Sequence, residues 1–174
     1  MNFSPIQDII EDMRQGTMVI MTDDTSRENE GDLIFPAGAV TPDKVNFMAK
    51  YGRGLICVPL SENRLKQFGL RDMVEQNQDA LKTAFTVSVD AKQGVTTGIS
   101  AYDRARTIEV LSRPESMPHD LQMPGHIFPL RAKRGGVLIR CGHTEAAVDL
   151  ARLSGWDESA VICPISSSVN YTPL

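Results

Sequence analysis

Short apolar runs alternate with segments of helical spacing along most of this 174-residue chain. Each run contains only three to five residues, a length typical of buried strands, and glycine, proline or polar residues separate the runs from the helical segments. Strands that alternate with helices indicate a layered α/β domain, and short returns between strands favour a mixed sheet over a purely parallel one. We therefore predict a single three-layer α/β domain with a mixed, twisted sheet flanked by helices.

The runs that we expect to form strands cover residues 18–21, 33–35, 55–58, 85–89, 137–139 and 161–163. The expected helices cover residues 4–15, 41–51, 61–69, 101–111 and 143–153. Serine or threonine followed by proline, at 4–5 and 41–42, marks two of the helix starts. Three prolines between residues 112 and 125 predict a loop there. The polar residues 22–32 follow the first strand directly, so we expect them to leave its carboxyl end.

Composition excludes several classes of protein. A hydrophobic content of 41% is enough to bury one core, and nothing in the composition requires a second domain. A net charge of −4 argues against a nucleic-acid-binding surface, which needs clustered lysine and arginine. No apolar stretch is long enough to cross a bilayer, and the first residues do not resemble a secretory leader. Three cysteines in no zinc or redox spacing favour a reducing compartment, so we expect a cytoplasmic protein.

The densest polar motif is the loop at residues 23–32. It contains one arginine, Arg27, and five acidic residues, which are Asp23, Asp24, Glu28, Glu30 and Asp32. Carboxylate oxygens suit magnesium, which usually takes one or two protein ligands and leaves its other positions to water and substrate. A solvated, salt-bridged surface turn would have the same composition. The metal interpretation therefore depends on which other residues converge on this loop.

A second polar motif, residues 140–145, lies between an apolar run and the start of an expected helix. The N-terminus of a helix offers backbone N–H groups to an anion, and Arg140, Gly142 and Thr144 add a guanidinium, close access and a hydroxyl. The sequence therefore predicts a phosphate-binding turn. His143 in this turn is either a metal ligand beside the phosphate or a histidine that caps the helix.

Other polar residues allow both a structural and a chemical interpretation. His126 follows Pro124 and Gly125, which predict a constrained turn, and it could act as an acid or base or be only a hydrogen-bonded loop histidine. Residues 96–104 form a polar approach to a helix, in which Ser100 or Thr97 could act as the cap. Among the cysteines, Cys57 could approach a site, whereas Cys163 is expected in the core.

Four separated motifs occur in an order that resembles the 3,4-dihydroxy-2-butanone 4-phosphate synthase family. They are Arg-Glu-Asn-Glu-Gly-Asp at 27–32, Thr-Gly-Ile-Ser-Ala-Tyr-Asp-Arg at 97–104, Pro-Gly-His-Ile-Phe-Pro-Leu at 124–130 and Gly-His-Thr-Glu-Ala-Ala-Val-Asp-Leu at 142–150. The resemblance extends from about residue 6 to residue 163. It implies a carbon–carbon lyase of riboflavin biosynthesis that converts D-ribulose 5-phosphate into 3,4-dihydroxy-2-butanone 4-phosphate and formate. It also implies dependence on Mg²⁺, with Mn²⁺ as an alternative, and a homodimer.

The resemblance also implies roles for individual residues. The implied metal ligands are Glu28 and His143. The residues implied to contact the sugar or its phosphate are Arg27, Glu28, Asp32, Arg140, Cys141, Gly142, His143 and Thr144. The implied catalytic residues are His126, which matches an essential histidine, together with Glu30 and Asp32 as proton carriers. Proton abstraction beside a ketone and stabilisation of an enediolate need such a base and a Lewis acid, and the sequence leaves open which carboxylate acts first.

One departure from the family pattern divides the chain into a synthase-like domain, 1–163, and a divergent, truncated C-terminal tail, 164–174. Pro164 stands where the family has a glutamate important for catalysis, and proline lacks the backbone donor of an interior strand. An alternative function is therefore a catalytically impaired paralogue that binds sugar phosphate without full turnover. A third possibility is a nucleotide-binding module of the related fold that includes threonylcarbamoyl-adenylate synthases, although no basic surface is evident.

Overall fold

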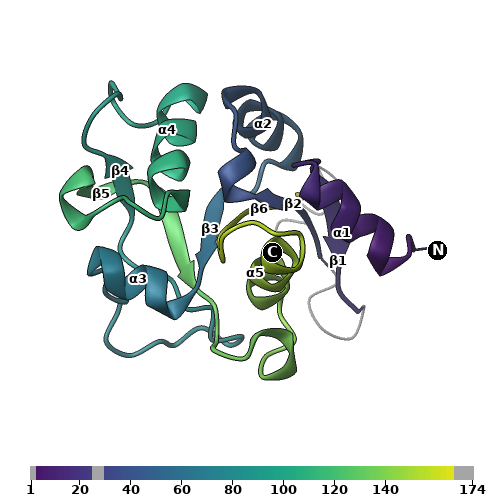
Figure 1. Ribbon diagram of the computed structural model, residues 1–174. Helices are drawn as coiled ribbons and strands as arrows, with labels where there is room; N and C mark the ends of the chain where they lie inside the picture. The colour runs from purple at the N-terminus through teal and green to yellow at the C-terminus, as the bar shows by residue number, and fades with distance from the viewer. Residues whose placement is uncertain (1–2, 25–29, 167–174) are drawn as a thin grey trace, which may run out of the picture.

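The computed structural model describes residues 3–24 and 30–166 of the chain. Within those ranges six strands form one sheet in the order β1-β2-β6-β3-β5-β4 (Figure 1). The strands are β1 (Val19–Thr22), β2 (Gly31–Pro36), β3 (Cys57–Leu60), β4 (Val89–Ala91), β5 (Leu121–Arg131) and β6 (Ala160–Pro164). β3 and β5 run parallel, whereas the other neighbouring strands of this sheet are antiparallel. The predicted mixed sheet is therefore confirmed.

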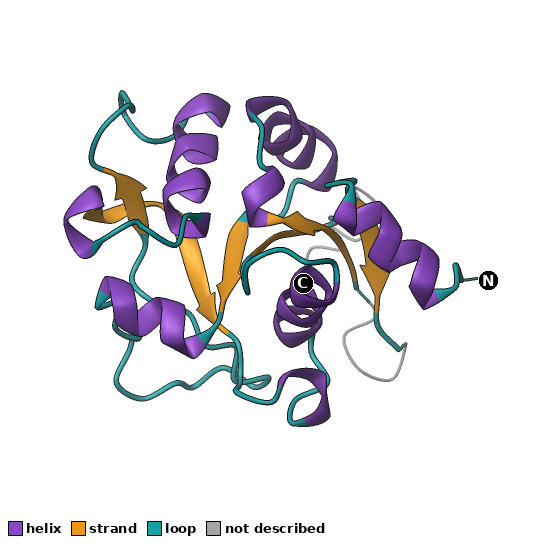
Figure 2. Cartoon of the chain, in the orientation of Figure 1, coloured by secondary structure: helices purple, strands orange, loops and turns teal. Residues whose placement is uncertain are grey.

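Helices cover both faces of the sheet (Figure 2). They are α1 (Ile6–Arg14), α2 (Pro42–Phe47), α3 (Glu62–Phe68), α4 (Ala101–Ser112) and α5 (His143–Leu153). Shorter turns are η1 (Ala37–Ala39), η2 (Met48–Gly52), η3 (Pro118–Asp120) and η4 (Gly136–Leu138). Side chains of α2, α3 and α4 share one hydrophobic cluster with the sheet, and side chains of α1 and α5 share the other. The three-layer α/β fold is therefore confirmed.

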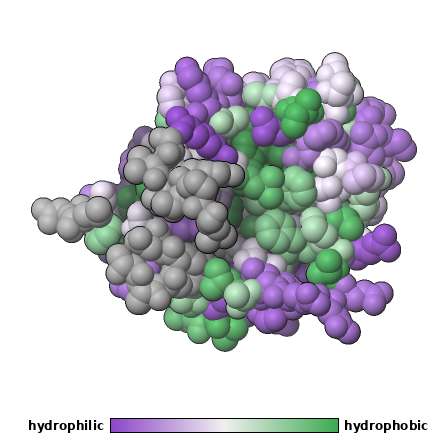
Figure 3. Space-filling model, turned by 180° about the vertical axis from the view of Figure 1, so that it is seen from behind, coloured by the Kyte–Doolittle hydropathy of each residue, from purple (hydrophilic) through white to green (hydrophobic). Residues whose placement is uncertain are grey.

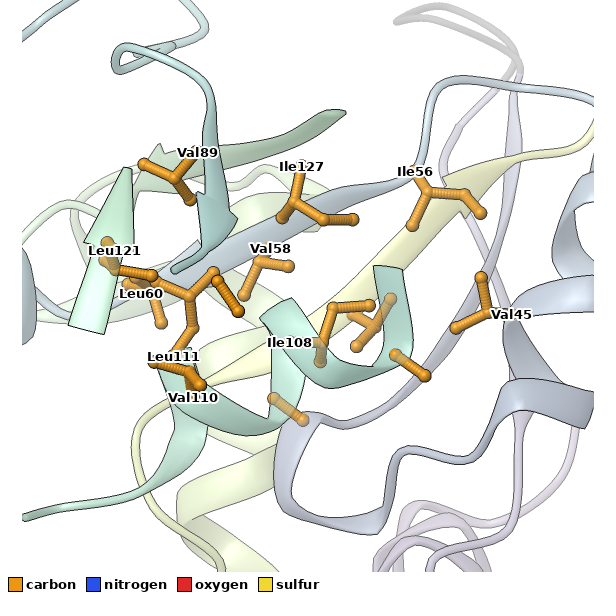
Figure 4. Close-up of a cluster of buried hydrophobic side chains, with 14 of the residues drawn as sticks. Val45, Ile56, Val58, Leu60, Val89, Ile108, Val110, Leu111, Leu121 and Ile127 are labelled. Atoms are coloured by element: carbon orange, nitrogen blue, oxygen red, sulfur yellow. The ribbon is translucent and has the colours of Figure 1, made fainter. Parts of the chain in front are cut away.

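The larger cluster fixes α4 against the sheet. Ile108 and Leu111 of α4 meet Val58 of β3 and Ile127 of β5 in this cluster, and each of these side chains is fully buried (Figure 4). Burying an aliphatic side chain of this size contributes about 1.5–3 kcal/mol to the free energy of unfolding. The packing holds β4 and β5 in place, and these strands carry His126 and its neighbours.

Side-chain caps place the starts of three helices as the sequence predicts. The hydroxyls of Thr41, Ser61 and Ser100 accept backbone N–H groups at the first turns of α2, α3 and α4. Ser100, and not Thr97, is therefore the cap of α4. At α1 the residue before the helix is Pro5, and Ser4 makes no cap, so that detail of the prediction is wrong.

The apolar run 137–139 predicts a strand, and this prediction is wrong. Gly135 and Gly136 adopt φ values of +94° and +61°, which turn the chain into the short helix η4. The backbone N–H of Val137 then donates to the Asp149 carboxylate on α5. Leu138 is left 92% exposed, so the run contributes an apolar surface instead of a core strand.

Residues 112–125 do not form the continuous loop that the three prolines predict. Pro118 begins η3, and β5 starts at Leu121, so Pro124, Gly125 and His126 belong to a strand and not to a turn. Pro124 is exposed and lies between the two stretches of β5 that pair with β4, where a missing N–H removes no ladder bond. In the expected strand 85–89, Phe85 and Thr86 make only isolated bridges. The regular strand, β4, begins at Val89.

Two further strands differ from expectation in their surroundings. β1 is an edge strand with Ile20 62% exposed, so it is not fully buried. Pro164 ends β6 opposite Asp32, and its carbonyl accepts the N–H of Gly54 at 3.1 Å. The N–H of Ile165 donates to Gly31 at 2.7 Å, so sheet pairing continues past the proline. No helix in the described ranges is long and apolar enough to span a membrane.

Candidate functional site

A cavity of about 230 Å³ lies where β2, β3 and β6 approach the start of α5. Its polar wall consists of Glu30, Asp32, Thr83, Arg140, His143 and Thr144. Its remaining wall consists of Leu55, Cys57, Leu81, Phe85, Leu130, Ile162 and Pro164. The cavity therefore brings the end of the acidic motif together with the 140–144 turn, two segments that the sequence analysis singled out separately.

Asp32 and His143 form the most buried polar contact of this cavity. Oδ2 of Asp32 lies 3.3 Å from Nδ1 of His143, and their side chains are only 4% and 9% exposed. Within the described residues, the other carboxylate oxygen, Oδ1 of Asp32, is buried without a hydrogen-bond partner. A buried carboxylate oxygen without a partner is costly, and a bound cation or hydroxyl group would remove that cost.

The 140–144 turn is held in shape by Arg140. Its Nη1 donates to the buried Glu145 carboxylate at 2.7 Å, and its Nη2 donates to the Leu81 carbonyl at 3.0 Å. A Cβ at Gly142 would lie 2.3 Å from Arg140 Nη1, so a side chain there would displace the guanidinium from this position. The guanidinium has five N–H donors, and these two bonds leave others for a ligand.

The first turn of α5 borders the cavity through His143 and Thr144. Gly142 precedes the helix in an extended conformation and offers no side-chain cap, and the first helical bond shown is from Ala146 N–H to the Gly142 carbonyl. A helix start without a side-chain cap is a common site for an anion, so the phosphate-binding turn stays a prediction. Thr144 is buried within the cavity wall, whereas Cys141 is exposed and does not line the cavity.

The acidic motif is only partly described. The backbone N–H of Glu30 donates to the Asp23 carboxylate at 3.0 Å, and the N–H of Asp23 donates to the Glu30 carbonyl at 3.3 Å. These two bonds close the loop at its base and leave Glu30 exposed at the cavity. Arg27 and Glu28, which were expected to contact the sugar and the metal, lie outside the described residues.

The chemistry of the cavity suits a hard divalent cation. The Asp32 carboxylate faces Nδ1 of His143, and an imidazole held in this way presents Nε2 as the ligand nitrogen. Across residues 3–24 and 30–166, three or more His, Cys, Asp or Glu side chains nowhere converge in the manner of a dedicated metal cage. Magnesium usually keeps several waters and takes one or two protein ligands, so this sparse donor set fits it.

The cysteines follow the two sequence expectations. Cys57 lines the cavity, and burial, with smaller contributions from Cys163 and Asp32, raises the pKa of its thiol to about 12. Cys163 is fully buried in the core on the other face of the sheet, and burial raises its pKa to about 11. Both groups are therefore protonated thiols at neutral pH, and Cys57 contributes an apolar wall.

His126 is not brought to this cavity. It lies on β5, where its Nδ1 is 2.8 Å from Oδ2 of Asp90 and its backbone N–H donates to Oδ1 of the same carboxylate at 2.9 Å. Asp90 is 2% exposed, whereas the His126 side chain is 40% exposed. Gly98 packs directly against this pair. The motifs at 97–104 and 124–130 therefore meet at a second place on the chain.

Sequence reasoning missed two residues that organise these places. Asp90 directly follows the alternating run 85–89, and an acidic residue in that place was the available signal. Glu145 lies in the first turn of α5, where it accepts both Arg140 and the N–H of Lys133. An acid in a first helical turn is common, so its sequence position alone did not mark it.

Comparison with known proteins identifies the relatives of this chain. A family model for 3,4-dihydroxy-2-butanone 4-phosphate synthase matches residues 7–172. The riboflavin biosynthesis protein RibBA of Aquifex aeolicus is 56% identical over 165 residues, which cover 94% of this chain and 41% of that protein. The 3,4-dihydroxy-2-butanone 4-phosphate synthase of Pseudomonas syringae pv. tomato is 54% identical over 165 residues, which cover 95% and 45%. The chain thus spans less than half the length of these curated relatives.

Solved structures agree with these sequence matches. A crystal structure of 3,4-dihydroxy-2-butanone 4-phosphate synthase in complex with two magnesium ions superposes with a TM-score of 0.92 at 45% identity, covering 99% of this chain and 82% of that one. A two-domain 3,4-dihydroxy-2-butanone 4-phosphate synthase from A. baumannii superposes with a TM-score of 0.91 at 47% identity, covering 95% and 48%. At these identities the similarity concerns more than the fold alone.

Proposed function

The chain belongs to the 3,4-dihydroxy-2-butanone 4-phosphate synthase family, and from this premise we propose that it converts D-ribulose 5-phosphate into 3,4-dihydroxy-2-butanone 4-phosphate and formate. The observation that carries the proposal is the cavity in which Asp32 contacts His143 of the 140–144 turn. A five-carbon sugar phosphate has one phosphate for the turn and hydroxyl and carbonyl oxygens for the polar wall. The reaction divides its five carbons into one and four without a further reactant.

Binding begins with the phosphate in this proposal. The first turn of α5, which has no side-chain cap, and the guanidinium of Arg140 would supply N–H donors, and Thr144 would add a hydroxyl at the same wall. Glu145 offsets part of the Arg140 charge. Because the Glu145 side chain is buried, the ion pair also fixes the direction of the guanidinium. A fixed phosphate would keep the sugar in place while its carbon skeleton rearranges. Cys141 and Gly142 would contribute through their backbone.

Proton transfers are assigned to the carboxylates that follow the acidic loop. Asp32 is buried and has one oxygen without a partner in the described residues, so it can approach a C–H or O–H group of a bound sugar. Glu30 is exposed at the same cavity and can exchange protons with solvent. We assign the abstraction step to Asp32 for this reason, with Glu30 as the second proton carrier.

A divalent cation completes the site. Glu28 and His143 would hold Mg²⁺, or Mn²⁺ in its place, and Arg27 would contact the sugar. When bound, the cation acts as a Lewis acid that stabilises negative charge developing on the substrate oxygens. A family member crystallised with two magnesium ions supports this requirement.

A homodimer would reconcile the two separate places that carry the family motifs. His126 lies outside the cavity of its own chain, so its proposed acid or base role requires a second copy to approach the cavity. Leu55 and Leu81, at 48% and 43% exposed, lie on the cavity wall, and Leu138 is 92% exposed nearby in sequence to Arg140. Figure 3 shows apolar side chains gathered on one face of the molecule. Such an area is typical of a protein interface.

The test incubates the purified chain with D-ribulose 5-phosphate and magnesium and measures formate. Formate that appears with magnesium and disappears with a chelator supports the proposal. Retained binding of ribulose 5-phosphate without formate at high protein concentration would indicate a binding paralogue. Binding of ATP or RNA without affinity for ribulose 5-phosphate would indicate a nucleotide-binding module of the related fold.

A further inference from the structure

We infer that Asp90 is a positioning residue that holds the His126 imidazole in its Nδ1–H tautomer, so that Nε2 is the nitrogen that accepts a proton. The inference rests on the proposed function in one respect, because the tautomer matters to turnover only if His126 acts on the substrate. The geometry of the pair itself is independent of that function.

Both oxygens of Asp90 are committed to His126. Oδ1 accepts the backbone N–H of His126 at 2.9 Å, and Oδ2 lies 2.8 Å from the ring Nδ1. A carboxylate can only accept hydrogen bonds, so the ring nitrogen that faces it must carry the proton. The neutral ring then has its lone pair on Nε2. In the described residues Nε2 has no hydrogen-bond partner, and the 40% exposure of the side chain leaves the ring accessible.

The pairing of β4 with β5 is irregular beside this contact. The register between β4 and β5 shifts between Val89 and Asp90, as at a β-bulge, and a bulge re-aims the side chain beside it. The Ser88 hydroxyl accepts the N–H of Gly125, and Asp90 accepts the N–H of His126. Two side chains thus replace the backbone acceptors of a regular ladder. A Cβ at Gly125 would lie 2.0 Å from the Val89 carbonyl carbon, so only glycine permits this approach.

Gly98 closes the other side of the pair. It adopts φ +92°, and a Cβ there would lie 2.1 Å from Oδ2 of Asp90 and 2.6 Å from Nδ1 of His126. The Asp103 carboxylate holds this loop by accepting the N–H of Gly98 at 3.0 Å and that of Thr96 at 3.1 Å. The backbone therefore covers the Asp90–His126 contact, and no side chain at position 98 can compete for the Nδ1 proton.

A purely structural role for Asp90 accounts for only half of these contacts. One Asp90 oxygen that accepts the backbone N–H of His126 would be enough to hold β5. In a buried core, the second oxygen would then be expected to face apolar side chains. Instead the second oxygen of a 2% exposed carboxylate meets the ring of a side chain that is 40% exposed. The arrangement is similar to that of a buried carboxylate that orients a catalytic histidine, in which the carboxylate fixes the tautomer and does not itself become protonated.

The first experiment measures the tautomer directly. The chain has three histidines, His119, His126 and His143, so ¹⁵N NMR of the imidazoles in the full chain gives three resolvable spin systems, assigned with H126Q. We expect an Nδ1–H tautomer for His126 in the wild type. In Asp90→Asn the amide can donate to Nδ1, so the ring should change to Nε2–H. His119, which is 77% exposed, serves as the internal reference.

The second experiment measures formate release. Loss of the correct tautomer in Asp90→Asn should lower kcat by about 10²- to 10⁴-fold with little change in KM for ribulose 5-phosphate. Gly98→Ala should also shift the His126 signals and lower kcat, as Asp90→Asn does. Gly94→Ala is the matched control, because Gly94 has φ +79° in the same loop and its added Cβ would meet only Arg106, at 3.2 Å. It should carry similar backbone strain and leave kcat unchanged.

Each outcome decides a separate point. An Nε2–H tautomer of His126 in the wild type overturns the inference, even if Asp90→Asn does not fold. A changed tautomer in Asp90→Asn together with an unchanged kcat also overturns the inference. If the wild type releases no formate, the proposed function fails, and the NMR measurement still decides whether Asp90 fixes the ring.

Discussion

The Asp32 carboxylate of β2 lies 3.3 Å from Nδ1 of His143, the first residue of α5, and both side chains are nearly enclosed. The contact joins the end of the acidic motif to the 140–144 turn. Because β2 is hydrogen-bonded to β6 and α5 packs on both strands, the distance between these groups is set by the core and not by the loops.

Arg140 should matter for both substrate binding and stability. Arg140→Gln removes a donor to the phosphate and leaves the buried Glu145 carboxylate with only the N–H of Lys133. We expect KM for ribulose 5-phosphate to rise about 10- to 100-fold and the free energy of unfolding to fall by about 1–3 kcal/mol. Steady-state kinetics and denaturant unfolding measure the two effects.

Arg152→Gln is the matched control on the same helix. Arg152 pairs with Asp149 at 3.3 Å with its side chain 55% exposed, and an exposed pair of this kind contributes less than about 1 kcal/mol. Equal losses of affinity in the two variants would show that Arg140 has no specific role.

Position 164 should respond to a carboxylate. Pro164 lines the cavity and pairs with Asp32 across neighbouring strands, so a side chain at 164 lies on the same face of the sheet as Asp32. The family resemblance implies a glutamate at this position, and we expect Pro164→Glu to raise kcat for formate release by about tenfold or more. Pro164→Gln, of the same size without the charge, should not. A rate that is unchanged in both variants would show that the proline is not limiting.

The three cysteines should differ sharply in reactivity. Burial raises the pKa of Cys57 to about 12 and that of Cys163 to about 11, so almost none of either thiol is ionised at pH 7, whereas Cys141 is exposed. In native protein a thiol-specific reagent should label Cys141 rapidly and the other two only after denaturation. Cys141→Ser should remove the fast phase. Simultaneous labelling of all three cysteines would contradict the buried positions of Cys57 and Cys163.

Asp103 should make stability depend on pH in the acid range. The Thr96 hydroxyl, followed by backbone N–H groups of Thr96 and Gly98, holds the pKa of this carboxyl below its usual range. A lowered native pKa contributes stability above the unfolded pKa, and that contribution is lost as pH falls through the native pKa. Thr96→Val should therefore be less stable than wild type at about pH 6, with the difference shrinking near about pH 2. A difference that grows on acidification would have the wrong sign.

Much of the fold could be predicted because the hydrophobic periodicity is local. The apolar runs of β2, β3 and β6 and the capped starts of α2, α3 and α4 were visible in the sequence. The run 137–139 was misread because the φ values of Gly135 and Gly136 depend on how that turn meets Asp149 of α5. No periodicity contains that information.

The candidate site could be predicted only in part, because it depends on contacts between distant segments. The 140–144 turn was recognisable from its position before a helix, and Asp32 from the acidic motif. Nothing in the sequence placed Asp90 against His126, because that contact depends on the register shift of β4 against β5 and on the close approach of Gly98. Sequence patterns identified the residue types, and the sheet register determined their partners.

The most direct test of the central claim is the amount of formate that purified chain releases from D-ribulose 5-phosphate with magnesium. The account predicts one formate for each ribulose 5-phosphate consumed, together with 3,4-dihydroxy-2-butanone 4-phosphate. It also predicts a loss of about 10²- to 10⁴-fold in Asp32→Asn and no loss in Asp43→Asn, a substitution on the exposed first turn of α2. No formate from the wild type, or formate release that Asp32→Asn leaves unchanged, would contradict it.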